Sequence, residues 1–433
     1  MKILFLTPGT GSYYCGACMR DNILARELLR SGHEVTIAPM YLPLMIDDIQ
    51  LPGLEQTPIF FGGINVYLQQ KLSFFRKSPA FLDRLFNARG LLRWAARHSH
   101  MTSAREHGEM SLEMLNIETS AFRKESEKLF AWLDQTPKPD LVCLSNTLLA
   151  GFASEMKRRL GAPVVSFFQG EDSFLDGLPE PYRTQCWTTM AKRLADSDAV
   201  LAPSRSYADY MRTRLEPLPG AIEVVHNGIR LEDYPAAPAQ DSAHPVIGYF
   251  ARMTRDKGVE LFVEAFIHLA KDLGNTTARA SIGGAATAGD LPLIDTLQRR
   301  LASAGLADRV TWATNLSRED KLAFLRSLSL FSVPVLYREA FGLYVVEAMA
   351  CGVPVVQPDA SSFPEIIAAG GGGVCVPPKD ARALAHAWQL LLADEPRRRA
   401  LGTAARLSVE KHFSAGTMSA QFMQVVDRLR IPA

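Results

Sequence analysis

Short apolar runs alternate with amphipathic stretches along most of this chain. The runs have the length of buried strands, and the stretches between them have the spacing of surface helices. This alternation is typical of β-α-β units, in which helices cover both faces of a parallel sheet. In the first half, the predicted strands are residues 2–7, 34–38, 141–144, 163–168, 199–202 and 222–225.

The pattern restarts after a linker at 231–244 that is rich in Pro, Ala and Asp. The second set of predicted strands is 246–250, 279–282, 309–312, 330–333 and 354–357. We therefore predict an α/β protein with two Rossmann-like domains, 1–228 and 229–414, that face each other across a cleft. A last helix, 415–433, is expected to pack back on the first domain.

Length and composition agree with this division. A chain of 433 residues is long enough for two cores. A net charge of +1 provides no overall field for nucleic acid. Six cysteines do not make a disulfide scaffold in a chain this long. The first apolar run is too short for a signal peptide, and no run reaches about 18 apolar residues. We expect a cytoplasmic protein, either free or peripheral at the inner face of the membrane.

An insertion at about 51–130 interrupts the first domain; it has little strand signal except at 64–68 and is mostly helical in pattern. Within it, residues 71–105 hold eight basic side chains and one acidic one, so the rest of the chain carries a charge of −6. Aromatic and leucine residues alternate with these charges. The stretch could bind an anionic membrane surface or a lipid-linked acceptor, or it could pack its apolar face on the domain. The sequence favours neither reading.

The segment 338–356 has the most informative chemistry. After the strand 330–333, Gly342 lets the chain turn into a helix that begins near Leu343. The free N–H groups of such a helix start can bind a diphosphate. Glu339 precedes the helix and Glu347 lies within it. Two carboxylates beside a phosphate site are reasonable if each accepts hydrogen bonds from sugar or ribose hydroxyls.

Two further loops support a phosphate ligand. Arg252 and Lys257 follow the strand 246–250 and are expected to lie close together, where they would neutralise a pyrophosphate. Gly283 and Gly284 follow the next strand and would permit close approach of the backbone to a ligand.

These residues together resemble the retaining glycosyltransferases of the GT-B fold, especially glycosyltransferase family 4 (glycosyl transferases group 1). Glu339 and Glu347 match its Glu-x7-Glu signature, and Arg252 and Lys257 match its basic pair. The resemblance extends over nearly the whole chain outside the insertion. It also includes Asn227-Gly228 before the linker, and Gly11 with a helix from about Asp21, which are similar to the family's N-terminal glycine loop.

The resemblance implies a role for each matched residue. Glu347 would bind the ribose hydroxyls and Glu339 the donor sugar. Arg252 and Lys257 would bind the diphosphate. Backbone N–H groups would come from Phe341, Gly342 and Leu343. The implied reaction is metal-independent transfer of a sugar, with retention, from a nucleoside-diphosphate sugar to a hydroxyl acceptor. No cofactor is implied besides this co-substrate, and no nucleic acid partner.

The sequence departs from the family pattern at Gln169, which stands where many members have a histidine near the donor sugar. Glutamine can donate or accept a hydrogen bond but cannot titrate. Either the role at this position is only to orient the ligand, or Glu171 or Asp172 contributes. Residues 311–315 also lack the family's glycine near the nucleobase.

Tyr13 and Tyr14, in the loop before the first helix, could stack on a sugar. Cys15 and Cys18 form a C-x-x-C pair nearby, and no second Cys or His pair stands at zinc spacing. For this pair a role in packing or in an acceptor pocket is favoured over redox chemistry.

Two other functions remain open at this stage. One is a non-catalytic subunit that binds a sugar nucleotide and supports a partner; it would show neither donor hydrolysis nor transfer. The other is a sugar-nucleotide epimerase of the same fold, which would convert free donor without an acceptor.

Overall fold

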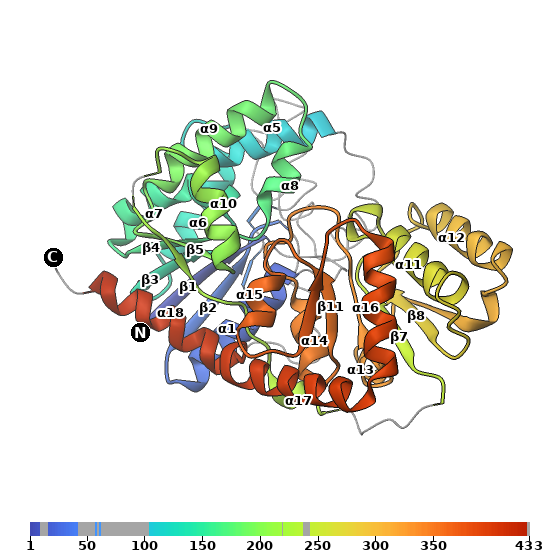
Figure 1. The fold of residues 1–433 in the computed structure, drawn as a ribbon. Coiled ribbons are helices and arrows are strands. Elements are labelled where there is room, and N and C mark those ends of the chain that lie inside the picture. Colours follow the sequence, from blue (N-terminus) through green and yellow to red (C-terminus); the bar gives the residue numbers. More distant parts are fainter. Residues whose placement is uncertain are drawn as a thin grey trace. The chain divides into compact units, whose positions relative to one another are not determined.

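The computed structural model describes residues 1–8, 16–41, 57–58, 60–61, 104–218, 220–236 and 243–430 (Figure 1). Contacts divide the chain into two compact units. The first comprises Met1–Pro203, Ala208–Val225 and Ser419–Ala433, and the second comprises Ser204–Tyr207 and His226–Met418. No helix in the described part of the chain is long and apolar enough to cross a membrane.

The described residues of the first unit form a sheet of six parallel strands in the order β2-β1-β3-β4-β5-β6. The central strands are buried along their whole length, as expected for a parallel sheet covered on both faces. The strands are β1 (Lys2–Thr7), β2 (Glu34–Pro39), β3 (Leu141–Leu144), β4 (Val164–Phe167), β5 (Ala199–Ala202) and β6 (Ile222–Val224).

Helices connect these strands on one or the other face of the sheet. Their bounds are α1 (Gly16–Arg30), α5 (Ala104–Leu115), α6 (Arg123–Leu133), the 3-10 helix η4 (Thr147–Phe152), α7 (Ala153–Leu160), α8 (Glu171–Asp176), α9 (Tyr182–Leu194) and α10 (Arg205–Arg214). The α7 helix shows how the local sequence sets the buried face and the end of a helix. It buries Ala153, Met156 and Leu160 on one side and ends at Gly161, whose φ of 67° only glycine adopts readily.

The second unit also has a sheet of six parallel strands among its described residues, in the order β12-β11-β10-β7-β8-β9. Counted from β7, this is the 3-2-1-4-5-6 strand order of the Rossmann dinucleotide-binding fold. The strands are β7 (Val246–Phe250), β8 (Arg279–Gly284), β9 (Val310–Thr314), β10 (Leu330–Phe331), β11 (Val355–Pro358) and β12 (Gly373–Val376).

The helices of the second unit are α11 (Val259–Lys271), α12 (Leu291–Ser303), α13 (Arg318–Arg326), α14 (Leu343–Ala350), α15 (Phe363–Ala368), α16 (Ala381–Ala393) and α17 (Glu395–His412). Side-chain caps start several of them: Ser317 accepts a hydrogen bond from the N–H of Asp320, and Asp380 accepts one from that of Ala383. The core includes Trp388, which is fully buried and donates its indole N–H to Ser332 Oγ at 2.9 Å.

The last helix, α18 (Ala415–Arg430), belongs to the first unit from Ser419 onward. There Phe422 stacks on Phe167 of β4 with ring centroids 5.8 Å apart, and Arg428 pairs with Glu223 of β6. Most of this helix therefore belongs to the first unit, although it follows α17 of the second unit in the sequence.

Several predicted boundaries were wrong. The first helix begins at Gly16 and not near Asp21, so Cys18 lies buried inside it and not in a loop. The sequence analysis did not predict the strand β12 or the helices α7, α8, α9, α10, α13, α15 and α17. The predicted strand 64–68, the insertion at 62–103 and nearly all of the basic stretch 71–105 lie outside the described residues; α5 and α6 are described.

Candidate active site

The second sheet reverses its strand order between β7 and β10, and ligands of such sheets bind at the carboxyl ends of the strands at this switch point. The chain that leaves β7 contains Arg252 and Lys257, and the chain that leaves β10 contains Tyr337 and Glu339. The register pairs Leu330 with Ile247 and Phe331 with Gly248, so the short strand β10 runs parallel to β7 directly beside it. The fold thus brings two loops that are about 80 residues apart in sequence to one place.

Glu339 is the centre of a compact polar cluster at this switch point. One of its carboxylate oxygens, Oε2, accepts hydrogen bonds from Lys257 Nζ at 2.5 Å and from the hydroxyls of Tyr337 and Tyr344, each at 2.9 Å. The side chains of Lys257 and Glu339 are only 10% and 13% exposed. The N–H of Glu339 donates to Ser361 Oγ at 3.0 Å, which fixes the backbone as well. The carboxylate is therefore held firmly.

The surroundings of Glu339 favour its charged form. Burial alone would raise the pKa of this carboxyl, but Lys257 and the hydrogen bonds from Lys257, Tyr337 and Tyr344 together hold the pKa below its ordinary value. Glu339 is thus a carboxylate at neutral pH, and it can only accept hydrogen bonds.

Glu347, on α14, is held in a similar way by different residues. Its Oε1 accepts hydrogen bonds from Tyr234 Oη and Lys321 Nζ, both at 2.6 Å. The Glu347 side chain is 4% exposed. Burial, and then the neighbouring carboxylate of Glu347, raise the pKa of Tyr234 well above its ordinary value. Tyr234 therefore stays protonated and donates a hydrogen bond to Glu347. Neither Tyr234 nor Lys321 was predicted, because they lie 113 and 26 residues from Glu347 in the sequence.

The start of α14 has the geometry that the sequence predicted. Gly342, at its N-cap, has φ 86° and makes no side-chain cap. A Cβ there would lie 2.9 Å from the ring of Phe363, so both the backbone angle and the space require glycine. Phe341 is buried against the rings of His226 and Phe413, and Leu343 is the first helical residue.

The predicted basic pair is split between two environments. Arg252 is exposed, with 64% of its side chain accessible, and lies only 3.9 Å from Asp256. Lys257 is instead buried against Glu339 and Tyr337, as described above. Both residues lie near Tyr249, whose hydroxyl donates to the carbonyls of Arg252 and Lys257, but their side chains differ in exposure. Arg252 remains accessible to an anion, whereas Lys257 already has a carboxylate partner.

The structure gives a packing reason for glycine at positions 283 and 284, which the sequence did not reveal. They end β8, and a Cβ on Gly284 would lie 1.6 Å from the carbonyl oxygen of Ala251. A Cβ on Gly283 would lie 2.8 Å from the ring of Phe250. Packing against the end of β7 therefore requires glycine at both positions, and a role of these two residues at a ligand stays a prediction.

In the first unit, Gln169 follows β4 and its side-chain amide donates to the carbonyl of Ser145 at 3.1 Å. Glu171 accepts hydrogen bonds from the backbone N–H of Gln169 at 2.8 Å and from that of Thr147 at 3.0 Å. Burial raises the pKa of Glu171 despite these bonds. Asp172 is also buried. Glu171 therefore braces the loop that presents Gln169, and both of its oxygens are occupied by the backbone.

A buried ion pair on α1 was missed by the sequence analysis. Arg20 Nε donates to Asp21 Oδ1 at 2.7 Å, and Ser145 Oγ donates to Asp21 Oδ2. The Arg20 guanidinium also donates to the Ser145 carbonyl at 3.0 Å and lies 4.0 Å from the Phe167 ring centroid. Burial raises the pKa of Asp21 although Arg20 and Ser145 act in the opposite direction. The adjacent opposite charges of Arg20 and Asp21 were the available signal in the sequence.

Four predicted site residues remain, and the structure describes one of them. Asn227 is buried in the second unit next to His226, which lies 2.7 Å from Glu365. Gly11, Tyr13 and Tyr14 lie outside the described residues. Among the residues that the structure describes, no group of three or more His, Cys, Asp or Glu side chains is arranged to hold a metal ion.

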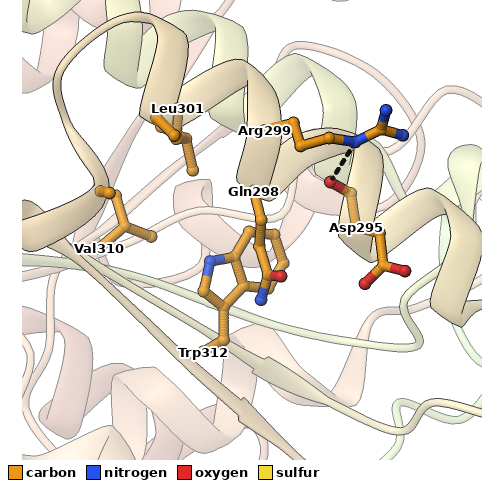
Figure 2. A pocket seen from close by; sticks show the side chains of 8 residues that line it. Asp295, Gln298, Arg299, Leu301, Val310 and Trp312 are labelled. Atoms are coloured by element: carbon orange, nitrogen blue, oxygen red, sulfur yellow. Dashed lines mark hydrogen bonds between the residues drawn. The ribbon is translucent and has the colours of Figure 1, made fainter.

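A separate hollow of about 650 Å³ lies at the outer edge of the second sheet, between α12 and β9. Figure 2 shows Trp312 and Val310 of the strand facing Gln298 and Leu301 of the helix, with Arg299 donating to the carbonyl of Asp295 at 3.4 Å. The hollow lies beside the first residues of β9, away from the carboxyl end of the strand. None of the predicted site residues lines it.

The described residues form two parallel α/β sheets, and the second sheet has carboxylates and cations at its switch point. This architecture is that of the GT-B class of folds. Sequence comparison gives the family. Residues 232–408 match the model of glycosyl transferases group 1, and residues 118–233 match that of Glycosyltransferase Family 4. The chain belongs to this family of GT-B glycosyltransferases.

Known proteins similar to this chain agree with that assignment. The lipopolysaccharide core biosynthesis mannosyltransferase LpsB of Rhizobium meliloti is 34% identical over 182 residues, which are 40% of this chain and 49% of that protein. The chain spans about half the length of the curated relatives that it matches at this level of identity.

Two solved structures share the fold over nearly their whole length. Sucrose-phosphate synthase from Thermosynechococcus elongatus has a TM-score of 0.70 at 18% identity, with 99% of both chains covered. Anabaena Alr3699/HepE, in complex with UDP, has a TM-score of 0.67 at 18% identity, with 99% of this chain and 100% of that one covered. At this level of identity, the likeness establishes the fold alone.

Proposed function

We propose that this protein is a retaining glycosyltransferase that moves a sugar from a nucleoside-diphosphate sugar to a hydroxyl acceptor. One observation carries the proposal. At the switch point of the second sheet, Glu339 is held by a lysine and two tyrosines, and Glu347, on the helix that follows, is held by a lysine and a tyrosine. In both cases all of these donors contact a single carboxylate oxygen. The other oxygen of each glutamate has no hydrogen bond among the described residues and can accept one from a ligand hydroxyl.

The donor would be bound by both glutamates and by the groups around them. Glu347 would accept hydrogen bonds from the ribose, and Glu339 from the transferred sugar. The diphosphate would lie at the start of α14, where Gly342 leaves the first N–H groups uncapped. Arg252 is accessible and can bind a phosphate through two parallel hydrogen bonds. Anabaena Alr3699/HepE, which shares the fold, has been solved with UDP-glucose, which supports a donor of this class.

In the proposed reaction, the bond between the anomeric carbon and the diphosphate oxygen breaks, and a bond from that carbon to the acceptor oxygen forms. The proton of the acceptor hydroxyl passes to the departing phosphate oxygen. Arg252, Lys257 and the start of α14 stabilise the negative charge that develops on the leaving diphosphate. Because these groups supply positive charge from the protein, we propose that transfer needs no metal ion.

The relatives suggest a hexose as the transferred sugar. LpsB is named as a mannosyltransferase of lipopolysaccharide core biosynthesis, and others are named as D-inositol 3-phosphate glycosyltransferases. We propose a hexosyl donor and leave glycan, lipid-linked and small-molecule hydroxyls as acceptor classes. The basic stretch 71–105 is compatible with the second of these on its sequence alone.

The test is a transfer assay with a panel of UDP-, GDP-, ADP- and dTDP-hexoses and a mixture of hydroxyl acceptors, in buffer with and without EDTA. The proposal expects one donor to yield a glycosylated product, with the same anomeric configuration as the donor by NMR and the same rate in EDTA. Conversion of free donor to another sugar nucleotide would instead indicate an epimerase. Donor binding without hydrolysis or transfer would indicate a non-catalytic subunit. Inversion, or loss of activity in EDTA, would contradict the corresponding part of the proposal.

A further inference from the structure

The hydrogen bonds on Glu339 are unevenly distributed between its two oxygens. Lys257 Nζ and the hydroxyls of Tyr337 and Tyr344 all donate to Oε2. No described residue donates to Oε1. A carboxylate with three donors on one oxygen cannot rotate without breaking them, so its second oxygen keeps one direction.

The two tyrosines also hold the lysine. Lys257 Nζ donates to Tyr337 Oη at 2.5 Å, and this hydroxyl in turn donates its own proton to Glu339. The ammonium lies 4.9 Å from the ring centroid of Tyr337 and 5.2 Å from that of Tyr344, within the range of cation–π attraction. The tyrosine rings and hydroxyls thus fix both members of the ion pair.

We infer that Tyr337 and Tyr344 are positioning residues, which hold Glu339 so that Oε1 alone faces the donor sugar as an obligatory hydrogen-bond acceptor. The inference rests on the proposed function for its role in catalysis, but the hydrogen bonds on Glu339 can be tested without a substrate. A charged acceptor with one free oxygen requires a hydroxyl on the sugar at that point. A donor that is deoxygenated there would leave this oxygen buried without a partner, which is costly.

Several charged and titratable residues act on Glu339 or on the tyrosines beside it. Lys257, Tyr337 and Tyr344 contact it directly. Asp256 and Arg252 act on Tyr337, and Tyr249 acts on Tyr344. Of the three direct contacts, only the tyrosine hydroxyls can be removed without removing a charge or a ring. Tyr337→Phe and Tyr344→Phe therefore test the hydroxyls alone.

The first measurement needs no substrate. In full-length protein labelled with ¹³C at the glutamate carboxyl carbon, the signal of Glu339 is assigned by its absence in Glu339→Gln and titrated with pH. Because hydrogen bonds to the carboxylate favour its charged form, loss of either hydroxyl should move the titration of Glu339 to higher pH. Tyr210→Phe is the matched control. The hydroxyl of Tyr210, on α10 of the first unit, accepts a hydrogen bond from Arg214, so its loss should leave the titration of Glu339 in place.

The second measurement is release of nucleoside diphosphate from UDP-glucose or GDP-mannose, whichever is the better donor of the wild type. Each tyrosine variant should lose roughly tenfold in kcat/KM, mainly in kcat, and the acidic limb of its pH profile should move upward with the titration. An unchanged titration together with unchanged kinetics in both variants would overturn the inference. A shifted titration in a protein that accepts no donor would keep the positioning role and reject the proposed function.

Discussion

The two sheets of this protein have the same parallel architecture but use their buried charges in opposite ways. Next to β3 of the first sheet, Asp21 uses both oxygens within the protein, one for Arg20 and one for Ser145. Glu171, after β4, likewise gives both oxygens to backbone N–H groups. At the switch point of the second sheet, Glu339 and Glu347 each use one oxygen.

This difference separates carboxylates that serve the fold from carboxylates that are available to a ligand. A buried charge must be compensated in either case, because an unpaired one is too costly. When both oxygens are compensated internally, nothing is left for a ligand. When lysine and tyrosine compensate one oxygen, the residue stays charged and the other oxygen remains available. The predictions below test this contrast, from the largest expected effect to the smallest.

The largest effect is expected from Arg20→Met in the first unit. The substitution leaves Asp21 buried without its cation, and breaking one side of a buried pair costs about 3–5 kcal/mol of unfolding free energy. Urea unfolding at pH 7 measures it. Arg158→Met, which removes an exposed partner of Glu155, should leave the unfolding midpoint nearly unchanged. Equal small losses in both variants would show that the Arg20–Asp21 pair does not stabilise the first unit.

Glu339→Gln should lower kcat by roughly 100-fold or more while the protein stays folded, because the amide loses the charge next to the reacting sugar. Transfer kinetics with the best donor and far-UV circular dichroism measure the two parts. Glu395→Gln, at the start of α17, is the matched control and should keep the wild-type rate. Full activity in Glu339→Gln would remove the catalytic assignment.

The two members of the basic pair should behave differently because their environments differ. Lys257→Ala and Arg252→Ala should each weaken donor binding by roughly tenfold, since each loses a charge-assisted contact to phosphate. Only Lys257→Ala should also lower the unfolding free energy, because it leaves Glu339 without its cation. Calorimetric titration with the donor and urea unfolding separate the effects. A stable Lys257→Ala protein with unchanged donor affinity would contradict both roles of Lys257.

The smallest effect is on how the unfolding free energy depends on pH. Glu171 and Glu339 should contribute with opposite sign, because their pKa values are shifted in opposite directions from the ordinary glutamate value of 4.5. Glu171 has a raised pKa when folded, so its contribution to stability is present below pH 4.5 and is lost as the pH rises through the folded value. Glu339 has a lowered pKa, so its contribution is present above pH 4.5 and is lost as the pH falls through the folded value.

Unfolding free energies of the wild type, Glu171→Gln and Glu339→Gln across this range measure the effect. The stability advantage of the wild type over Glu171→Gln should shrink as the pH rises, and its advantage over Glu339→Gln should grow. Parallel curves for the two variants would show that the two carboxylates do not differ in this way.

Much of the fold was predictable from the sequence, because buried parallel strands leave continuous apolar runs and Gly342 marks an unusual backbone angle. The positions of Glu339 and Glu347 also followed from local sequence. Their partners did not. Tyr234 and Lys321 reach Glu347 only through the tertiary fold, and the same holds for the approach of Lys257 to Glu339. Tyr337 and Tyr344 lie within five residues of Glu339, but an aromatic residue near a motif is more often a core residue than a hydrogen-bond donor.

The roles of the glycines and of the basic pair were harder to read. Gly284 has no side chain because the backbone of Ala251 occupies that space, and nothing local distinguishes this from an approach to a ligand. Arg252 and Lys257 have similar charge in the sequence, yet one is exposed and the other is buried. Burial is decided by packing across several elements, which a local pattern does not record.

The central claim is that the second unit binds a nucleoside diphosphate through Glu347, Lys257 and the start of α14. Thermal unfolding of the wild type, Glu347→Gln and Lys257→Ala with UDP, GDP, ADP, CMP and dTDP tests it most directly. A ligand that binds only the folded state raises the melting temperature by mass action. We predict that one nucleoside diphosphate raises it in the wild type and clearly less in both variants. No shift with any nucleotide, or an equal shift in all three proteins, would contradict the claim.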